Sequence, residues 1–289
     1  MFSLEDLKNN LNIEQLDTYL FRGTSLDLGL PRVFGGQVLA QALNAAFRSV
    51  PEDRKPHSMH AYFLRPGDTK RQIIYEVDPI RDGRSFATRR VVAKQNGEAI
   101  FNTSISFHKL EPGLSHQMEL PVKVPAPDTL ISDTERLENY MKKHPIASRP
   151  FSFPQDVVDI RSAFGAPFDD EREDFDGFWF KFNGTFTKNP IMHHTLLAFI
   201  SDKRLMGTGL RVHNVRYQTH KVLGASLDHA LWFHDEIDLN QWILYYTDSP
   251  RAERARNFNR GSFYTQDGKL IASSAQEGLA RIIGVKDKV

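Results

Sequence analysis

Two stretches of the chain are apolar on nearly every side and predict buried helices. Residues 33–47, VFGGQVLAQALNAAF, leave almost no polar face. Residues 191–206, IMHHTLLAFISDKRLM, place apolar side chains at the spacing of one helical face, and Asp202 falls on that face. A buried carboxylate without partners is costly, so Asp202 is expected either to be hydrogen-bonded or to have a chemical task. The alternative is a slight roll of the helix that puts Asp202 beside Lys203 and Arg204 at a solvated edge.

Runs of alternating or continuous apolar residues, bounded by turn-forming residues, predict strands around both helices. The expected strands are 12–22, 58–65, 71–81, 84–94 and 98–108 in the first half, and 156–162, 177–186, 226–233, 241–247, 256–264 and 269–281 in the second. Asn96-Gly97 and Asp267-Gly268 each separate two such runs, which is a strong hairpin signal. A short capped helix is expected over residues 4–11.

The second half of the sequence repeats the first. Residues 60–64, HAYFL, resemble residues 229–233, HALWF, and QNGEAI at 95–100 resembles QDGKLI at 266–271 at nearly the same offset. Such self-similarity indicates a duplicated unit. Two copies of a helix and an antiparallel sheet predict an α+β fold in which two sheets pair edge to edge, each wrapped around its own apolar helix.

The predicted organisation is an N-terminal repeat over residues 1–110, a linker over 111–154 and a C-terminal repeat over 155–289. Prolines punctuate the linker, which is typical of a segment that crosses a surface. One charged stretch within it, SDTERLENYMKKH at 132–144, predicts a helix.

Composition removes several classes of function. Basic and acidic residues are balanced, 37 against 36, so neither a nucleic-acid partner nor a membrane surface is indicated. The sequence has no cysteine, and His193-His194 lacks the spacing of a helical metal pair, so no metal is expected. No serine-hydrolase elbow, phosphate loop or dinucleotide fingerprint occurs. Neither a signal peptide nor a run long enough to span a bilayer is found, and a cytoplasmic location is expected.

Several blocks together resemble the acyl-CoA thioesterase II family. They are LFRG, FGGQVLAQAL, YFLRPGD, RDGRSF, LDHALWFH, FYTQDG and AQEG, and the resemblance runs from about residue 11 to 281. It implies a double hotdog, with two antiparallel sheets each wrapped round a long central helix. It also implies hydrolysis of fatty acyl-CoA to a free fatty acid and CoA, with no cofactor beyond the CoA of the substrate, and a homodimer or homotetramer.

The same resemblance implies three catalytic residues that hold the attacking water. They are Asp202 in FISDKRL, Ser226 in ASLDHALWFH, where many relatives have Thr, and Gln276 in SSAQEGLAR. The chemistry agrees with these types, because a thioester carbonyl is already electrophilic and hydrolysis needs only a positioned water, a proton acceptor and oxyanion donors. Backbone N–H groups at Gly35 and Gly36, or at the turn before the second helix, are candidate oxyanion donors.

The repeat predicts one working site per chain. Aligning Gly97 with Gly268 places Ile105 opposite Gln276, and the helices align roughly with Asn44 opposite Asp202. The first half then lacks both polar groups and is expected to shape the acyl tunnel.

Two other functions are compatible with a hotdog protein: an acyl-thioester hydratase or dehydratase, which usually pairs a His with the helix acid, and a non-catalytic acyl-CoA binding module. The candidate bases His57, His60 and His229 have strand packing as their more ordinary role. Arginines around the sheet are candidates for the CoA phosphates; they are Arg65, Arg81, Arg84 and Arg260.

Overall fold

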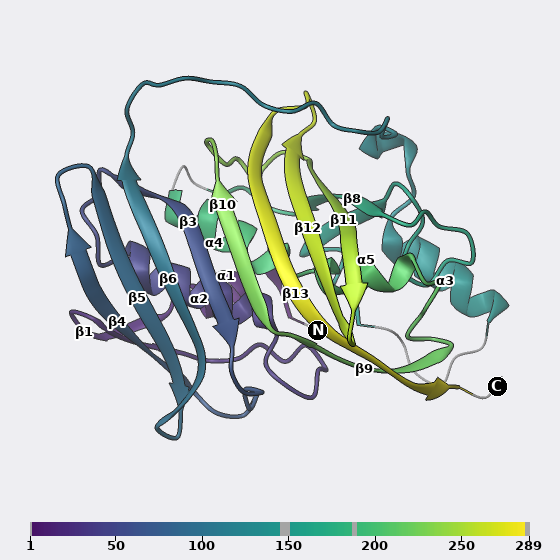
Figure 1. The fold of residues 1–289 in the computed structure, drawn as a ribbon, viewed down its shortest axis with the longest axis horizontal. Helices are drawn as coiled ribbons and strands as arrows, with labels where there is room; N and C mark the ends of the chain where they lie inside the picture. The colour runs from purple at the N-terminus through teal and green to yellow at the C-terminus, as the bar shows by residue number, and fades with distance from the viewer. Residues whose placement is uncertain (1, 145–150, 187–189, 287–289) are drawn as a thin grey trace.

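The computed structural model describes residues 2–144, 151–186 and 190–286, and shows one large curved sheet wrapped around two central helices (Figure 1). The elements in chain order are α1 (Leu4–Leu11), β1 (Glu14–Asp17), β2 (Leu20–Gly23), α2 (Gly35–Phe47), β3 (Arg54–Phe63), β4 (Ile73–Asp82), β5 (Phe86–Gln95), β6 (Glu98–Lys109), η1 (Pro127–Thr129), α3 (Asp133–Lys143), β7 (Val158–Ser162), β8 (Asp176–Phe182), α4 (Pro190–Ser201), α5 (Leu205–Arg211), β9 (His220–Ser226), β10 (Asp228–Phe233), β11 (Ile243–Glu253), β12 (Arg256–Thr265) and β13 (Leu270–Val285). No described helix is long and apolar enough to cross a membrane.

The described strands form a single antiparallel sheet, in the order β1-β2-β4-β5-β6-β3-β10-β13-β12-β11-β8-β7, with β9 added against β13. The two halves join at β3 and β10, where His60 lies opposite Ala230 and Ala61 opposite His229. The predicted edge-to-edge pairing of two antiparallel half-sheets is therefore confirmed.

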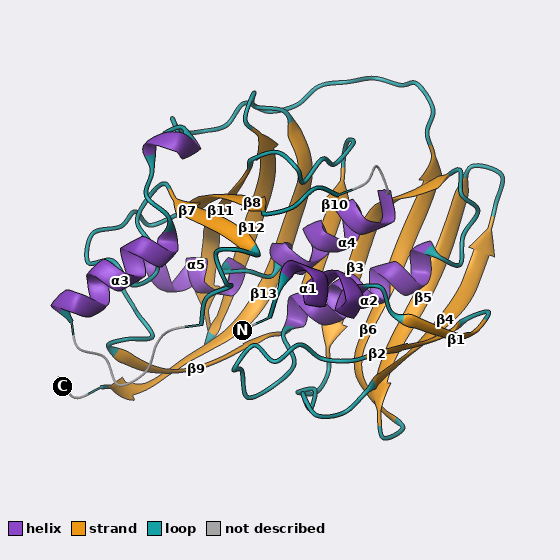
Figure 2. Ribbon diagram, turned by 180° about the vertical axis from the view of Figure 1, so that it is seen from behind, coloured by secondary structure: helices purple, strands orange, loops and turns teal. Residues whose placement is uncertain are grey.

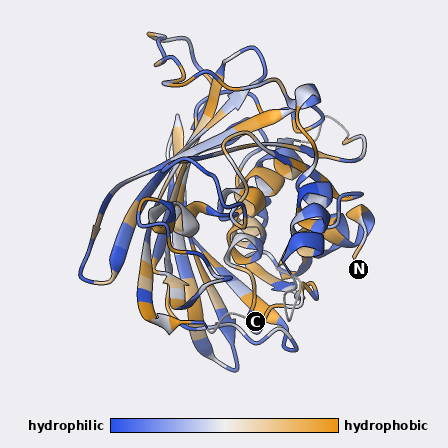
Figure 3. Ribbon diagram, turned by 90° about the vertical axis from the view of Figure 1, so that its right-hand side faces the viewer, coloured by the Kyte–Doolittle hydropathy of each residue, from blue (hydrophilic) through white to orange (hydrophobic). Residues whose placement is uncertain are grey.

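The core lies between this sheet and the helices α2 and α4 (Figure 2). Every residue of α2 from Gly36 to Phe47 is buried, as its nearly continuous apolar surface predicts. The two helices approach so closely that a Cβ added to Gly36 would lie 2.1 Å from the carbonyl oxygen of Phe199. Figure 3 shows helices of apolar colouring within the curve of the sheet.

Cross-strand register shifts one of the two sequence alignments, that of residues 60–64 with residues 229–233, by one residue. His229 is buried in β10, whereas His60 in β3 is exposed and packs against the Trp232 ring. The two histidines thus face opposite sides of the sheet, and neighbouring strand residues always alternate in this way. Phe63 corresponds instead to Phe233. The N–H of the residue after Phe63 bonds the carbonyl of Ile100, and the N–H of the residue after Phe233 bonds the carbonyl of the equivalent Ile271.

The helix expected over 191–206 is wrong in its second part. The helix α4 ends at Ser201, and the chain turns through Asp202 and Lys203 before α5 begins at Leu205. Arg204 has φ of 67°, a left-handed conformation that breaks the helical path. Asp202 therefore does not lie on the apolar face of a continuous helix. It projects from the turn that follows α4.

Smaller differences concern strands and the linker. The segment expected as one strand over 12–22 forms β1 and β2, and β9 precedes the strand expected from Ser226. The predicted helix of the linker is observed as α3, with Ser132 as its N-cap. The linker contacts the second half through Trp179, whose indole N–H donates to the carbonyl of Pro125. Residues 145–150 lie outside the described residues, and the boundaries 110/111 and 154/155 stay a prediction.

Candidate active site

The structure brings the three predicted site residues together at the turn after α4. Gln276 Nε2 donates to Asp202 Oδ1 over 2.9 Å, and Ser226 Oγ lies 3.5 Å from the same oxygen. The other carboxylate oxygen, Oδ2, accepts the backbone N–H of Gly36 over 3.0 Å. Asp202 thus has partners from both halves of the chain.

Strand β13 positions both polar partners of the carboxylate. Gln276 is fully buried on the inner face of β13, opposite Asn259 of β12. Ser226 ends β9 and lies opposite Gly278, two residues further along β13. Positions two apart on a strand face the same side, so one strand face sets the separation of the amide and the hydroxyl.

Asp202 also acts as the N-cap of a helix in the other repeat. The N-cap position of α2 is Phe34, whose side chain offers no hydrogen bond. The Asp202 carboxylate bonds the second N–H of that helix in its place, and the positive end of the helix dipole favours a negative charge there. This approach requires glycine, because a Cβ on Gly35 would lie 2.6 Å from Asp202 Oδ2.

The surroundings make Asp202 a better base than an exposed aspartate. Burial raises the pKa of Asp202 to about 6, and the hydrogen bonds from Gln276 and Gly36 oppose that shift in part. The carboxylate is ionised at neutral pH and close to the pKa at which a general base is most effective.

The amide of Gln276 keeps an unused acceptor beside this carboxylate. Its Nε2 is committed to Asp202, and its buried Oε1 has no hydrogen-bond partner among the described residues. A buried amide oxygen without a donor is costly in a native protein. It provides a fixed acceptor for a polar hydrogen of a molecule that enters the site.

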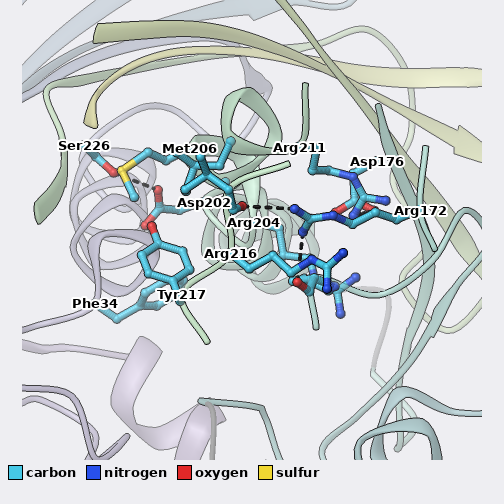
Figure 4. A pocket seen from close by; sticks show the side chains of 14 residues that line it. Phe34, Arg172, Asp176, Asp202, Arg204, Met206, Arg211, Arg216, Tyr217 and Ser226 are labelled. Atoms are coloured by element: carbon cyan, nitrogen blue, oxygen red, sulfur yellow. Dashed lines mark hydrogen bonds and ion pairs between the residues drawn. The ribbon is translucent and has the colours of Figure 1, made fainter. Parts of the chain in front are cut away.

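Two cavities meet at Asp202. One has a volume of about 260 Å³ and the other about 460 Å³, and both are lined by Phe34, Asp202, Met206 and Ser226. Figure 4 shows Ser226 and Asp202 facing each other at one side of the smaller cavity. The larger cavity is walled mainly by apolar residues of the first repeat; they include Val33, Val38, Phe63, Ile100 and Phe101. A molecule reaching through both cavities would pass the carboxylate.

Four arginines surround the far side of the smaller cavity, a feature that sequence reasoning missed. They are Arg172, Arg204, Arg211 and Arg216. Arg204 pairs with Asp133, and Arg211 lies 3.4 Å from Asp176. Burial and the charges of Arg211 and Arg216 lower the pKa of Arg172 to about 10. Because these residues lie far apart in the sequence, no local motif marked them.

The histidines considered as candidate bases do not contact Asp202. His57 Nε2 bonds Ser106, His60 packs on Trp232, and His229 Nε2 bonds Ser201. His193 and His194 bond separate backbone groups. Within the described ranges, no group of three or more His, Asp or Glu side chains is arranged to hold a metal ion.

The first repeat has apolar or structural residues where the second has its polar site. Register places Ile105 of β6 at the position of Gln276, and Arg89 of β5 at that of Asn259. Ile105 is fully buried, and the guanidinium of Arg89 is tied to Ser49 and Asp82. The predicted correspondence of Ile105 with Gln276 agrees with this register.

Comparison with known proteins places the chain among thioesterases. Residues 150–279 match the acyl-CoA thioesterase family, and residues 25–108 match the acyl-CoA thioesterase N-terminal domain. The chain is 38% identical to acyl-CoA thioesterase 2 of Haemophilus influenzae, over 96% of this chain and 99% of that protein. It is 36% identical to human acyl-coenzyme A thioesterase 8, over 94% of this chain and 88% of that protein.

Solved structures confirm the predicted double hotdog architecture. The crystal structure of an acyl-CoA thioesterase II from Mycobacterium marinum superposes with a TM-score of 0.77 and 33% identity, covering 96% of this chain and 98% of that one. A hotdog protein from Alicyclobacillus acidocaldarius has a TM-score of 0.76 at 19% identity, covering 95% and 97%, which supports the fold alone.

Proposed function

Since the chain belongs to the acyl-CoA thioesterase II family and is therefore an acyl-CoA hydrolase, we propose that Asp202, Ser226 and Gln276 hold the water that attacks the thioester carbonyl. The observation that carries this proposal is the position of Asp202. Its carboxylate, whose pKa burial raises to about 6, lies in hydrogen-bond contact with Gln276 and beside Ser226, where two cavities meet.

Each of the three residues has a distinct task in this mechanism. The carboxylate of Asp202 accepts a proton from the water as it attacks. Gln276 Oε1 accepts the second hydrogen, since its amide nitrogen is already bound to Asp202. The Ser226 hydroxyl can both donate and accept, and here it donates to one lone pair of the water oxygen. The other lone pair is then directed at the carbonyl. The water oxygen adds to the thioester carbonyl, the C–S bond then breaks, and CoA leaves as its thiol with the proton that Asp202 accepted. No covalent enzyme intermediate forms.

The start of α2 is suited to the negative charge that develops on the carbonyl oxygen. The N–H of Gly36 is occupied by Asp202, whereas Gly35, the first residue of the helix, has no acceptor for its N–H among the described residues. Backbone donors at a helix N-terminus are effective oxyanion ligands. We assign this role to Gly35 N–H, which narrows the candidates expected from the glycine pair.

We assign the larger cavity to the acyl chain. Its walls come mainly from the first repeat and are mainly apolar, with Arg32 and Arg65 also among the lining residues. Apolar walls suit a fatty acyl group, and Asp202 lines the same cavity. The second repeat, proposed to span residues 155–289, supplies the three polar residues, and the first, residues 1–110, supplies most of the acyl wall.

A hydratase or dehydratase is disfavoured by the contacts of the carboxylate. Those reactions pair the helix acid with a histidine, and the hydrogen bonds to Asp202 come from Gly36, Gln276 and Ser226. The candidate base His229 has its Nε2 bonded to Ser201. These contacts support the proposal that the site holds a water against the carboxylate.

We further propose a cytoplasmic homodimer or homotetramer. Exposed aromatic residues on the outer face of the sheet support self-association; they are Tyr62, Phe86 and Phe258. Light scattering of the purified protein gives the mass, and a monomer across the working concentration range would contradict this part of the proposal.

Release of free CoA thiol from short, medium and long acyl-CoA tests the proposed function. The wild type is expected to hydrolyse at least one of them, and Gln276→Leu to lower kcat by about 30-fold while KM changes by less than about twofold, because the amide acts on the water and not on substrate binding. Gln117→Leu, at an exposed glutamine that bonds the hairpin at Gly268, is the control and should retain activity. A wild type that binds acyl-CoA without releasing thiol would make the chain a binding module.

The pH dependence follows from the raised pKa of Asp202. The ionised carboxylate is the active form, so activity is lost as pH falls through the folded-state pKa of about 6. We expect kcat/KM to level off above about pH 7 and to fall about tenfold per pH unit below about pH 5.5. CoA phosphates titrate in the same range, so an acyl-pantetheine, which has no phosphate, is the matched substrate. A profile with its midpoint near pH 4 would show that burial does not raise the pKa of the titrating carboxylate.

A further inference from the structure

The last residue of α4 is fixed to the sheet by two side chains that the catalytic proposal does not use. Tyr245 of β11 donates its hydroxyl to the carbonyl oxygen of Ser201 over 2.7 Å. His229 of β10 lies 2.9 Å from the Ser201 hydroxyl through its Nε2. Ser201 is covalently joined to Asp202, so both contacts act on the residue that precedes the proposed base.

The direction of the histidine contact follows from counting hydrogens. Ser201 Oγ lies 2.9 Å from the carbonyl oxygen of Ala198, which can only accept. The single hydroxyl hydrogen is used there, so Oγ must accept from His229 Nε2–H. His229 is fully buried, and its burial lowers its pKa to about 3, which keeps the ring neutral with its proton on Nε2.

Tyr245 donates a hydrogen bond to a backbone carbonyl group at the end of α4. The final carbonyl groups of an α-helix have no intrahelical donor, and the Tyr245 hydroxyl supplies one to Ser201. The ring stacks on Phe263 with 3.9 Å between centroids and 9° between planes. Ser274 bonds the same hydroxyl at 2.8 Å, and Gly261 leaves the space, since a Cβ there would lie 2.4 Å from the tyrosine ring. The hydroxyl is thus held from several sides.

We propose that His229 and Tyr245 are positioning residues for catalysis, which hold the end of α4 so that the Asp202 carboxylate faces the attacking water. This inference rests on the proposed role of Asp202. A general base must stay within hydrogen-bond reach of its proton, and small misplacements cost much of the rate. Asp202 itself lies in the turn between α4 and α5, outside both helices. The two sheet residues restrain the backbone of the residue that precedes it.

The first repeat contains a matched tyrosine with no such task. Tyr75 of β4 occupies the position that Tyr245 has in β11, and it is likewise fully buried. Its hydroxyl donates to Gln41 Oε1 over 2.6 Å, in the middle of α2 and not at the end of a helix. The two tyrosines therefore offer the same substitution at equivalent buried positions, and only one of them contacts the residue before the base.

The test is a double-mutant cycle on the full-length protein. Tyr245→Phe is expected to lower kcat about tenfold with KM changed by less than about twofold, and Tyr75→Phe to retain at least about half of kcat. In an Asp202→Asn background, Tyr245→Phe should change the residual rate by less than about twofold, because a residue that acts through Asp202 has nothing left to position. The denaturant concentration at the midpoint of unfolding should fall by a similar amount in both tyrosine variants.

Four results would each overturn a part of the proposal. An equal loss of kcat in both tyrosine variants, or a full tenfold effect of Tyr245→Phe in the Asp202→Asn background, would overturn the positioning role and leave Tyr245 as a packing residue. High activity of Asp202→Asn alone would instead overturn the proposed base. For the histidine, His229→Gln retains a donor and should keep most of the kcat that His229→Leu loses; equal losses would remove His229 from the proposal.

Discussion

Replacing Asp202 by Asn is expected to lower kcat at least ~100-fold with little change in KM, because it removes the proposed proton acceptor and leaves the cavities intact. The substitution preserves the local geometry. Asn Oδ1 can accept the Gly36 N–H, and its amide nitrogen can donate to Gln276 Oε1, which has no other partner in the described part of the chain. Only a rotation of the Gln276 amide is required.

The same substitution is expected to preserve or raise the stability of the fold. An aspartate whose folded-state pKa is about 6 instead of 3.8 favours the protonated form of the native protein. Native stability therefore falls as pH rises from the unfolded pKa to the folded pKa, by about 3 kcal/mol at most. Asn carries no charge and avoids this cost, so at pH 8 the free energy of unfolding should be no lower than in the wild type.

Thiol release and urea unfolding measured on the same preparations separate the two roles of Asp202. Asp228→Asn is the control, because Asp228 is a half-buried carboxylate of the neighbouring strand that accepts the N–H of Glu277 and does not contact Asp202. It should keep most of kcat. An Asp202→Asn protein that is less stable but still turns over at more than about a tenth of the wild-type kcat would identify Asp202 as a structural cap of α2.

Local sequence signals were sufficient for the duplicated architecture. The hairpins at Gly97 and Gly268 both have positive φ at glycine, as the Asn-Gly and Asp-Gly pairs predict. The resemblance to a known family supplied Asp202, Ser226 and Gln276, and the structure brings these three together. Hydrophobic periodicity and strand propensity alone would have identified Gln276 only as an ordinary strand residue.

The features that sequence could not supply depend on contacts between distant segments. Leu205 and Met206 continue the apolar spacing of α4, so nothing local marks the break at Arg204; the turn is defined by what Asp202 bonds across the molecule. The alignment of His60 with His229 matched letters but not the sheet face. The contact of Tyr245 with Ser201 joins a strand to a helix end 44 residues earlier.

Gly36→Ala is expected to destabilise the protein by about 3 kcal/mol, because an added methyl group forces apart two packed helices. Its Cβ would lie 2.1 Å from the carbonyl oxygen of Phe199 and 2.5 Å from the Phe34 ring. The first contact is with backbone in the last turn of α4, which cannot move aside as a flexible side chain would. Alanine in a helix otherwise gains up to about 1 kcal/mol over glycine, and the clash must exceed that gain.

Gly207→Ala measures the stability that alanine gains over glycine in a helix when no clash opposes it. Gly207 lies within α5, and a Cβ there would meet no atom within 4 Å, so this variant should be as stable as the wild type or about 0.5–1 kcal/mol more stable. Urea unfolding curves of the two variants and the wild type, compared at equal m-value, give both differences in the free energy of unfolding. If Gly36→Ala unfolds at the wild-type midpoint, α2 and α4 are not in the close contact described.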